Sequence, residues 1–360
     1  MKVDTVPLQP RKAVLRMKEY HPPLADRLGL RFDFNENTSG CSPRVLAKLQ
    51  QVVGDQLARY PEREPVEILI AERLGVGANQ LLLTNGVDEA IHLVCETYLE
   101  PDDEVIIPLP TFGMYEVYAS QTDARVIPVQ AEDDLAIPVA KIIKAITERT
   151  KLICIANPNN PTGAVLKQRD LIEILKKAPQ AALLLDEAYF DFHGESQLTL
   201  LMQFPNLFLA RTFSKAYGLA GFRVGVLIGS ASTMPHVRRV SSPYNVNGVA
   251  LACLETALQD DTFIRDYVSQ VLEGREMLEQ SLTEHGIRWW KSRANFILFH
   301  VGEKHAVFVS AMRKRGILVR DRHKDPGCAG CVRITLGTRE HTARMLVELH
   351  AVVKELGIGR

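Results

Sequence analysis

The sequence lacks both a charge bias and a long apolar segment. Its 360 residues contain 43 Lys and Arg against 43 Asp and Glu, so the formal net charge is zero. That balance gives no reason to expect binding to nucleic acid or to an anionic membrane, although it leaves room for a local basic cluster. The N-terminal stretch MKVDTVPLQPRK is polar, and no segment approaches the roughly 18 uninterrupted apolar residues that a membrane helix needs. We therefore expect a cytoplasmic protein.

Cysteine is also scarce, with six residues in the chain, and several of them lie in apolar runs where a reduced cysteine packs as a small hydrophobic residue. Only Cys328 and Cys331 form a CxxC pair. A structural zinc site needs four ligands, and no second CxxC or HxxxH motif completes one. We interpret the stretch DPGCAGC as a glycine-rich turn and expect no metal site.

What the sequence does have is a regular alternation of short apolar runs with longer stretches of helical period. This pattern predicts an α/β protein with a mostly parallel sheet. Several runs are apolar at consecutive positions, as strands covered on both faces are. The predicted strands are Leu81–Thr84, Glu104–Pro108, Ala124–Val129, Lys151–Ala156, Ala182–Asp186, Leu207–Thr212 and Arg223–Gly229.

From about Val249 the pattern becomes mostly helical through about Glu284, and then it mixes short strands and helices up to a closing helix from about Arg339. A chain of this length with 46% hydrophobic residues has room for more than one domain. We expect a large domain over residues 51–260 and a smaller α+β domain over residues 261–360. Residues 1–50 are expected to form an N-terminal arm and part of the small domain.

The residues after the predicted strands form a coherent chemical set. In open α/β sheets ligands gather at the carboxyl ends of the strands, so these positions predict the site. Asn85 and Gly86 open a helix whose backbone N–H groups can hold a phosphate. The loop NPNNPTG is rigid and carries amide side chains, although by itself it is as well explained by a surface turn.

Two further strand ends supply ionisable groups. Asp186 abuts a buried run, where a carboxylate is costly unless a cation pairs with it, so a structural ion pair is an equally good explanation for this residue alone. Lys215 follows another run among small or apolar neighbours, which argues that its amine lies in a site. Together the strand ends supply the groups that pyridoxal phosphate needs. These are an amine nucleophile, a carboxylate, the phenol of Tyr189, an amide and a set of donors large enough for a phosphate.

Seven or more ordered motifs carry a resemblance over nearly the whole chain: DFNENTSGCSP, RYPE, TNGVDEAI, PTFGMY, NPNNPTG, DEAYFDF, RTFSKAYGLAGFRVG, ILVRDR and CVRITLGT. With these motifs the sequence resembles the pyridoxal-phosphate enzymes of the aspartate aminotransferase fold, known as fold type I. Within that fold it is most similar to the histidinol-phosphate aminotransferases. The resemblance implies a mostly parallel seven-stranded sheet flanked by helices and a smaller α+β domain.

The resemblance also implies roles for individual residues around pyridoxal 5'-phosphate. Lys215 would bind the cofactor covalently and then move a proton between the substrate's α-carbon and the cofactor. Asp186 would pair with the ring nitrogen, while Tyr189 and Asn160 would hydrogen-bond the ring hydroxyl oxygen. Phe112 would stack on the ring, where close relatives often have tyrosine. The cofactor phosphate would be bound by Gly86, Val87, Asp88, Thr212, Ser214 and Arg223.

Further implied roles concern the substrate and a second subunit. Arg320 and Arg333 match the family's two anion-binding arginines, which bind either a phosphate or the carboxylates of glutamate. Tyr20 and Asn35 would line the same pocket. Tyr60 would reach the cofactor phosphate of a neighbouring subunit, so the active site would require a homodimer. One departure is Thr38, where many relatives have proline; it bears on substrate-side geometry.

The resemblance predicts amino transfer between L-histidinol phosphate and 2-oxoglutarate, a step of histidine biosynthesis, by a ping-pong route through the pyridoxamine form. An aromatic amino acid aminotransferase has almost the same motifs. A phosphothreonine decarboxylase-like lyase would also use this lysine, aspartate and phosphate-binding arginine. A pyridoxal-phosphate-dependent sensor is a third alternative, but such proteins usually add a DNA-binding segment, and the sequence has neither a spare N-terminal domain nor a basic surplus.

Overall fold

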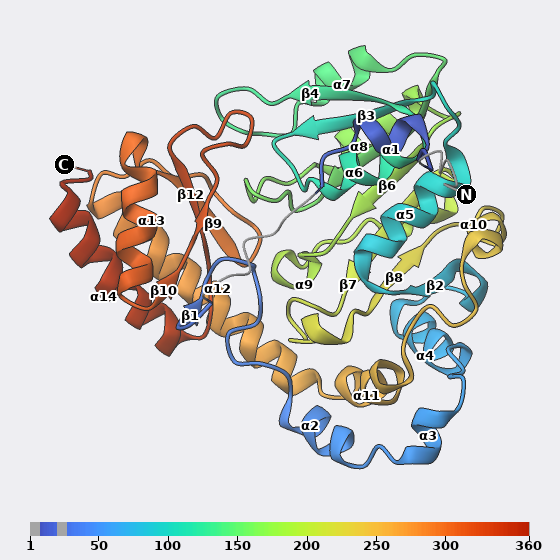
Figure 1. Ribbon diagram of the computed structural model, residues 1–360, viewed down its shortest axis with the longest axis horizontal. Coiled ribbons are helices and arrows are strands. Elements are labelled where there is room, and N and C mark those ends of the chain that lie inside the picture. The colour runs from blue at the N-terminus through green and yellow to red at the C-terminus, as the bar shows by residue number, and fades with distance from the viewer. Residues whose placement is uncertain (1–7, 20–26, 360) are drawn as a thin grey trace, which may run out of the picture.

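The computed structural model of the protein describes residues 8–19 and 27–359, and its largest element is a seven-stranded sheet (Figure 1). The strand order is β2-β8-β7-β6-β5-β3-β4. The strands are β2 (Leu81–Thr84), β3 (Glu104–Leu109), β4 (Arg125–Gln130), β5 (Thr150–Ala156), β6 (Ala182–Asp186), β7 (Leu207–Thr212) and β8 (Gly225–Ile228). Neighbouring strands are parallel except that β8 runs antiparallel to both β2 and β7. The predicted α/β class and its mostly parallel sheet are confirmed.

The consecutive apolar residues of these strands are explained by burial on both faces of the sheet. Every residue of β2, β6 and β8 is buried. Leu81 and Leu83 belong to the apolar cluster on one face, and Leu82 belongs to the cluster on the other. Because successive side chains of a strand point to opposite faces, a strand covered by helices on both sides is apolar throughout.

Helices cover each face of this sheet. The face that contains Leu82 is covered by α5 (Gly86–Tyr98), α6 (Met114–Gln121) and α10 (Met234–Val240). The opposite face is covered by α4 (Glu64–Leu74), α7 (Val139–Ala145), α8 (Gln168–Lys177) and α11 (Gly248–Leu258), with α2 (Pro43–Gln50) packed on α11. The remaining short helices are α1 (Lys12–Arg16), α3 (Gly54–Ala58) and α9 (Phe190–His193).

A second group of elements lies beside the large sheet. Its three-stranded antiparallel sheet has the order β11-β12-β9, from β11 (Arg320–Asp321), β12 (Cys331–Thr335) and β9 (Phe296–His300). The helices α12 (Asp261–Glu284), α13 (His305–Lys314) and α14 (Arg339–Leu356) pack around it with an apolar cluster of their own. This group provides one wall of the site described below.

Part of the N-terminal segment joins this second group, as the parallel pair β1 (Leu30–Arg31) and β10 (Ile317–Leu318) shows (Figure 1). The helix α1 instead packs on α6 of the large sheet. The stretch ILVR is divided between β10 and β11, which pair in different sheets. The domain boundaries at residues 50 and 260 stay a prediction. Within the described ranges, no helix is both long and apolar enough to cross a membrane.

Candidate active site

A cavity of about 600 Å³ lies at the carboxyl ends of β3, β5, β6 and β7 and is closed on its other side by residues 33–36 and 320–333. Most of the residues expected from the sequence line it. These are Asn35, Val87, Asp88, Phe112, Asn160, Asp186, Tyr189, Thr212, Ser214, Lys215, Arg223, Arg320 and Arg333. The strand ends therefore meet in one place, although they come from distant parts of the sequence.

Lys215 reaches the cavity from the loop that follows β7. Its amine donates a hydrogen bond to the backbone carbonyl of Phe34, 3.0 Å away, and lies 5.9 Å from the ring centroid of Tyr189. Burial, with a smaller contribution from the nearby Arg333, lowers the pKa of the lysine to about 8. A lysine in this state loses its proton close to neutral pH and can act as a nucleophile or a base.

Asp186 ends β6 with its carboxylate buried in the cavity wall. One oxygen accepts a hydrogen bond of 2.6 Å from the hydroxyl of Tyr115, and the other accepts one of 2.9 Å from the backbone N–H of Ala188. Burial raises the pKa of Asp186 to about 6 despite these donors. The carboxylate is therefore held in place but is costly in its ionised form, so a cation placed beside it would be stabilised.

Tyr115, which lines the cavity, was not among the residues predicted from the sequence. The side chain is fully buried in α6 and packs edge-on against Phe112, with ring centroids 5.8 Å apart and an interplanar angle of 87°. A signal was present in the motif PTFGMY, where the two aromatic residues are three positions apart and lie on one face of a helical turn. Its hydroxyl fixes the orientation of Asp186, so it positions that carboxylate.

Asn35 and Arg333, on the wall opposite the large sheet, meet Tyr189 and Asn160, which follow β6 and β5 of that sheet. The amide of Asn35 donates to the hydroxyl oxygen of Tyr189 at 2.9 Å. The guanidinium of Arg333 donates to the side-chain oxygen of Asn160 and, at 2.6 Å, to the backbone carbonyl of Asp33. Burial and then the neighbouring Arg322 lower the pKa of Arg333 to about 9. Because that value is above neutral, Arg333 keeps its charge and offers a buried cation to an anionic ligand.

The turn between β2 and α5 meets Arg223 at the far end of the cavity. The guanidinium of Arg223 lies 2.7 Å from a carboxylate oxygen of Asp88. Gly86 has a φ of +75°, and a Cβ on it would lie 2.7 Å from a terminal nitrogen of Arg223. The glycine is therefore required by its backbone conformation and by the close approach of the arginine, which brings helix N–H groups and a cation to one point.

These residues fit the pyridoxal phosphate that the resemblance implies. A lysine with a lowered pKa and a buried carboxylate line one cavity, and a glycine turn with an arginine forms an anion-binding end that a side chain on Gly86 would fill. Each of these three features meets one requirement of the cofactor: its aldehyde, its ring nitrogen and its phosphate.

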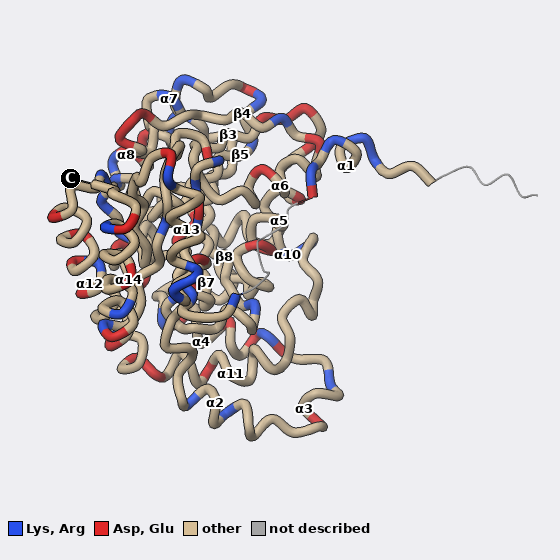
Figure 2. Tube along the Cα trace, turned by 60° about the vertical axis from the view of Figure 1, so that its left-hand side comes forward, with Lys and Arg blue, Asp and Glu red and all other residues tan. Residues whose placement is uncertain are grey.

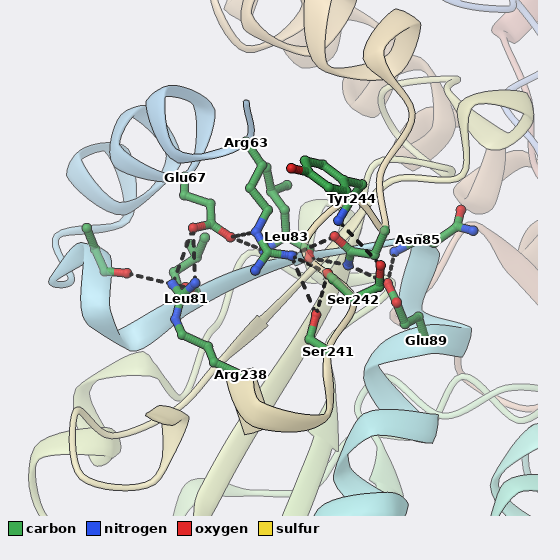
Figure 3. A network of polar contacts seen from close by, with 12 residues as sticks. Arg63, Glu67, Leu81, Leu83, Asn85, Glu89, Arg238, Ser241, Ser242 and Tyr244 are labelled. Atoms are coloured by element: carbon green, nitrogen blue, oxygen red, sulfur yellow. Dashed lines mark hydrogen bonds and ion pairs between the residues drawn. The ribbon is translucent and has the colours of Figure 1, made fainter. Parts of the chain in front are cut away.

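A network of polar contacts supports the glycine turn from outside the cavity (Figure 3). The side chain of Asn245 donates to the backbone carbonyl of Leu83 at 2.9 Å and to the carboxylate of Glu89 at 2.7 Å. The same carboxylate accepts the backbone N–H of Asn85, and Arg63 donates to Asn245 at 2.7 Å. The network thus ties the first turn of α5 to β2 and to the segment after α10.

Of the predicted site residues, Gly86 supports the cavity from the turn before Val87 without lining it, and Tyr60 and Tyr20 are placed differently from the rest. Tyr60 does not line the cavity; it is 78% exposed and stacks on Tyr244 with ring centroids 4.4 Å apart. Tyr20 lies outside the described residues. Thr38 is not among the residues that line the cavity, and its backbone N–H donates to the hydroxyl of Tyr267 at 3.2 Å while its own hydroxyl accepts the N–H of Thr338.

The CxxC pair lies outside the cavity wall in a turn. The backbone N–H of Cys331 donates to the carbonyl of Cys328 at 2.9 Å, and both side chains are buried in a cluster with Leu135 and Leu298. Among the residues that the structure describes, no group of three or more His, Cys, Asp or Glu side chains could hold a metal ion. The pair packs as two small hydrophobic side chains.

Comparison with known proteins identifies the family. Residues 29–349 match the model for aminotransferase class I and II. A histidinol-phosphate aminotransferase of Geobacillus sp. (strain WCH70) is 35% identical over 359 residues, which cover 97% of this chain and 96% of that protein. One of Thermoanaerobacter pseudethanolicus is 35% identical over 319 residues, which cover 86% and 89%. The crystal structure of histidinol-phosphate aminotransferase from Sinorhizobium meliloti in complex with pyridoxal-5'-phosphate is 22% identical with a TM-score of 0.86, over 96% of this chain and 97% of that one. The chain belongs to the aminotransferase class I and II family.

Proposed function

We propose that this protein is a pyridoxal-phosphate-dependent transaminase that interconverts L-histidinol phosphate and 2-oxoglutarate with imidazole-acetol phosphate and L-glutamate. The observation that carries the proposal is that one cavity contains the Lys215 amine and the buried Asp186 carboxylate together with Arg320 and Arg333. The first pair suits the cofactor, and the second pair suits an anionic substrate. The two relatives named above align with most of this chain, and both are named histidinol-phosphate aminotransferase.

Pyridoxal phosphate, when bound, supplies an electron sink that stabilises negative charge at the α-carbon of an amino substrate. Lys215 would attach it covalently and then carry the proton that leaves the α-carbon, a task for which its lowered pKa suits it. Asp186 would hold the ring nitrogen in its protonated form, and Tyr115 would keep that carboxylate in place. Asn160 and Tyr189 would hold the ring hydroxyl oxygen, with Phe112 against the ring.

The phosphate end would be bound at the turn that begins α5. The backbone N–H groups of Gly86, Val87 and Asp88 and the side chains of Thr212, Ser214 and Arg223 supply its donors. In the described structure the guanidinium of Arg223 is paired with Asp88. The N-terminus of α5 adds the positive end of its dipole, so the site suits a doubly charged anion.

The substrate end would use Arg320 and Arg333 for the phosphate of histidinol phosphate in one half-reaction and for the carboxylates of glutamate in the other. A planar guanidinium can bind either group through two parallel hydrogen bonds. Asn35 would line the same pocket, since its amide contacts Tyr189 and its backbone is held by Thr335. From the sequence, we also propose that Tyr20 lines this pocket. The sequence likewise supports a location in the cytoplasm.

The decisive measurement is steady-state kcat/KM on histidinol phosphate against phenylalanine and tyrosine, with 2-oxoglutarate as acceptor. We expect histidinol phosphate to be preferred, because the phosphate gains charge-assisted hydrogen bonds that a neutral ring does not. Efficient turnover of phenylalanine without conversion of histidinol phosphate would establish an aromatic aminotransferase instead. Release of carbon dioxide without a keto acid would establish a decarboxylase, since transamination stops after one half-reaction.

We further propose a homodimer in which Tyr60 completes the partner subunit's site. The support is that Tyr60 is mostly exposed and outside its own cavity, two residues after the end of α3. Figure 2 shows α1, α3 and α10 projecting on one side of the molecule. Exposed apolar side chains gather along the same part of the chain, namely Leu46, Leu49, Val53 and Leu57. Apolar side chains exposed in one copy are suited to burial against another.

Mixing two inactive variants tests the shared site. Lys215→Ala removes the nucleophile of one chain, and Tyr60→Ala removes the side chain that the partner's site would use. After the two variants are mixed and unfolded chains are reassembled, a hybrid contains one complete site, so we expect activity well above that of either variant alone. The hybrid is isolated with two different affinity tags. Restored activity is the expected outcome, and a hybrid no more active than its parents would contradict the shared site.

A further inference from the structure

The loop between β11 and β12 brings side chains into the cavity that the motif analysis did not single out. Arg322, Lys324 and Asp325 all line the cavity beside Arg320 and Arg333. The wall formed by the three-stranded sheet and this loop thus carries four basic side chains and one carboxylate. Such a wall suits a ligand group that carries more than one negative charge.

The loop is held by its backbone. The N–H of Arg322 donates to the carbonyl of Cys331 at 3.0 Å, and the N–H of Asp325 donates to the carbonyl of Arg322 at 2.9 Å. The N–H of Cys328 then donates to the carbonyl of Asp325 at 3.0 Å. These turns place Arg322 and Asp325 at the cavity without help from the contact between their side chains.

Those two side chains form an ion pair between a terminal nitrogen of Arg322 and a carboxylate oxygen of Asp325. Both are largely covered, with 14% of the arginine and 24% of the aspartate side chain exposed. The Nε of Arg322 is buried and has no hydrogen-bond acceptor among the described residues. A buried N–H group without an acceptor is costly. The guanidinium would therefore bind more strongly to a ligand that offers acceptors to all of its N–H groups.

Four other carboxylates that line the cavity have partners of their own. Asp33 and Glu36 lie 2.8 and 2.9 Å from the guanidinium of Arg27. Asp88 pairs with Arg223, and Asp186 accepts from Tyr115. Asp325 instead pairs with the basic wall through Arg322, and burial raises its pKa against the effect of Arg322, Arg333 and Arg320.

We propose that Arg322 is a third anion-binding side chain of the substrate site and that Asp325 is its resident counterion, which the phosphate group of the substrate displaces. The inference rests on the proposed function and deepens it. A phosphate monoester carries close to two charges and three acceptor oxygens, so it satisfies more of the basic wall than one carboxylate does. Displacement of Asp325 favours a phosphate over an uncharged side chain, whereas the carboxylates of glutamate would bind Arg320 and Arg333 and do not require it.

Two substitutions should change phosphate binding in opposite directions. Arg322→Gln removes the cation, and we expect the KM for histidinol phosphate to rise about 10- to 100-fold with little change in kcat, as loss of charge-assisted hydrogen bonds predicts. Asp325→Asn keeps the shape but removes the competing anion, so we expect the KM to fall several-fold. Inhibition by inorganic phosphate should weaken in the first variant and strengthen in the second.

Arg315→Gln is the matched control, because it removes the same charge at α13, where Arg315 pairs with Glu348 and Glu355 outside the cavity. Its KM should match that of the unaltered holoenzyme. If Arg322 and Asp325 served only to hold the loop together, both variants would raise the KM, and that result would overturn the proposal. Should the holoenzyme use phenylalanine and not histidinol phosphate, the proposed function fails, while phosphate inhibition of the phenylalanine reaction still tests Arg322.

Discussion

Replacement of Lys215 by alanine should abolish turnover and the visible absorption of the covalently attached cofactor together. The substitution removes both the point of attachment and the group that moves the α-proton. We expect kcat to fall by at least about 10⁴-fold, since general acid–base catalysis by one positioned group contributes up to about that much and covalent attachment of the cofactor is lost as well. The measurements are steady-state transamination and the visible spectrum before and after borohydride reduction, which fixes the cofactor on the lysine of the unaltered protein.

The fold should survive this change, because the Lys215 amine donates a single hydrogen bond among the described residues, to the Phe34 carbonyl, and is costly to bury in its charged form. Some cofactor should still bind through its phosphate at Gly86 and Arg223. Lys176→Ala provides the control, as Lys176 is an exposed lysine of α8. An unchanged spectrum and residual borohydride labelling in Lys215→Ala would place the attachment on a different lysine.

The position of the site could be predicted because the reactive and polar side chains come directly after the strands in the sequence. Asp186, Thr212 and Asn160 each stand at or just beyond the end of an apolar run, and parallel strands bring their carboxyl ends to one edge. The order of the strands did not have to be known for this argument. That order places β5 and β6 side by side and β8 between β2 and β7, which depends on long-range packing.

Contacts between segments far apart in the sequence could not be predicted, because no local sequence pattern indicates them. Tyr115 bonds Asp186 across 71 residues, and in the sequence it is one aromatic residue of an amphipathic helix. Arg322 and Asp325 are three apart in a polar loop, where an i,i+3 ion pair at the surface is common. Their place in the cavity follows from the pairing of β11 with β12, which turns the loop over the site.

Burial brings the pKa values of the two central ionisable groups, Lys215 and Asp186, closer together. It lowers the pKa of Lys215 to about 8 and raises that of Asp186 to about 6, so each charged form is less stable here than in water. Without the cofactor these charges are a cost to folding. With the cofactor bound, the Lys215 nitrogen would become a weaker base on covalent attachment, and Asp186 would gain a cationic partner. Binding of the cofactor should therefore stabilise the protein as well as activate it.

Asp186→Asn tests this relation, since the amide keeps the shape of the side chain and removes its charge. In the protein without cofactor, a carboxyl whose folded pKa of about 6 exceeds its unfolded value of 3.8 destabilises the fold progressively as the pH rises from about 4 to 6, and fully above that range. The cost at pH 8 is up to about 3 kcal/mol, because one pKa unit corresponds to about 1.4 kcal/mol.

We therefore expect the cofactor-free Asp186→Asn variant to unfold at a higher temperature than the unaltered protein at pH 8, with the difference disappearing near pH 4. With cofactor bound, the same variant should lose about 10²- to 10³-fold in kcat, because an amide cannot hold the ring nitrogen protonated. Asp133→Asn, at an exposed position, should change neither quantity. Equal melting temperatures of Asp186→Asn and the unaltered protein across this pH range would show that the carboxylate is not destabilised by burial. A raised melting temperature together with lost activity would show that the charge costly to the empty fold is the one that catalysis requires.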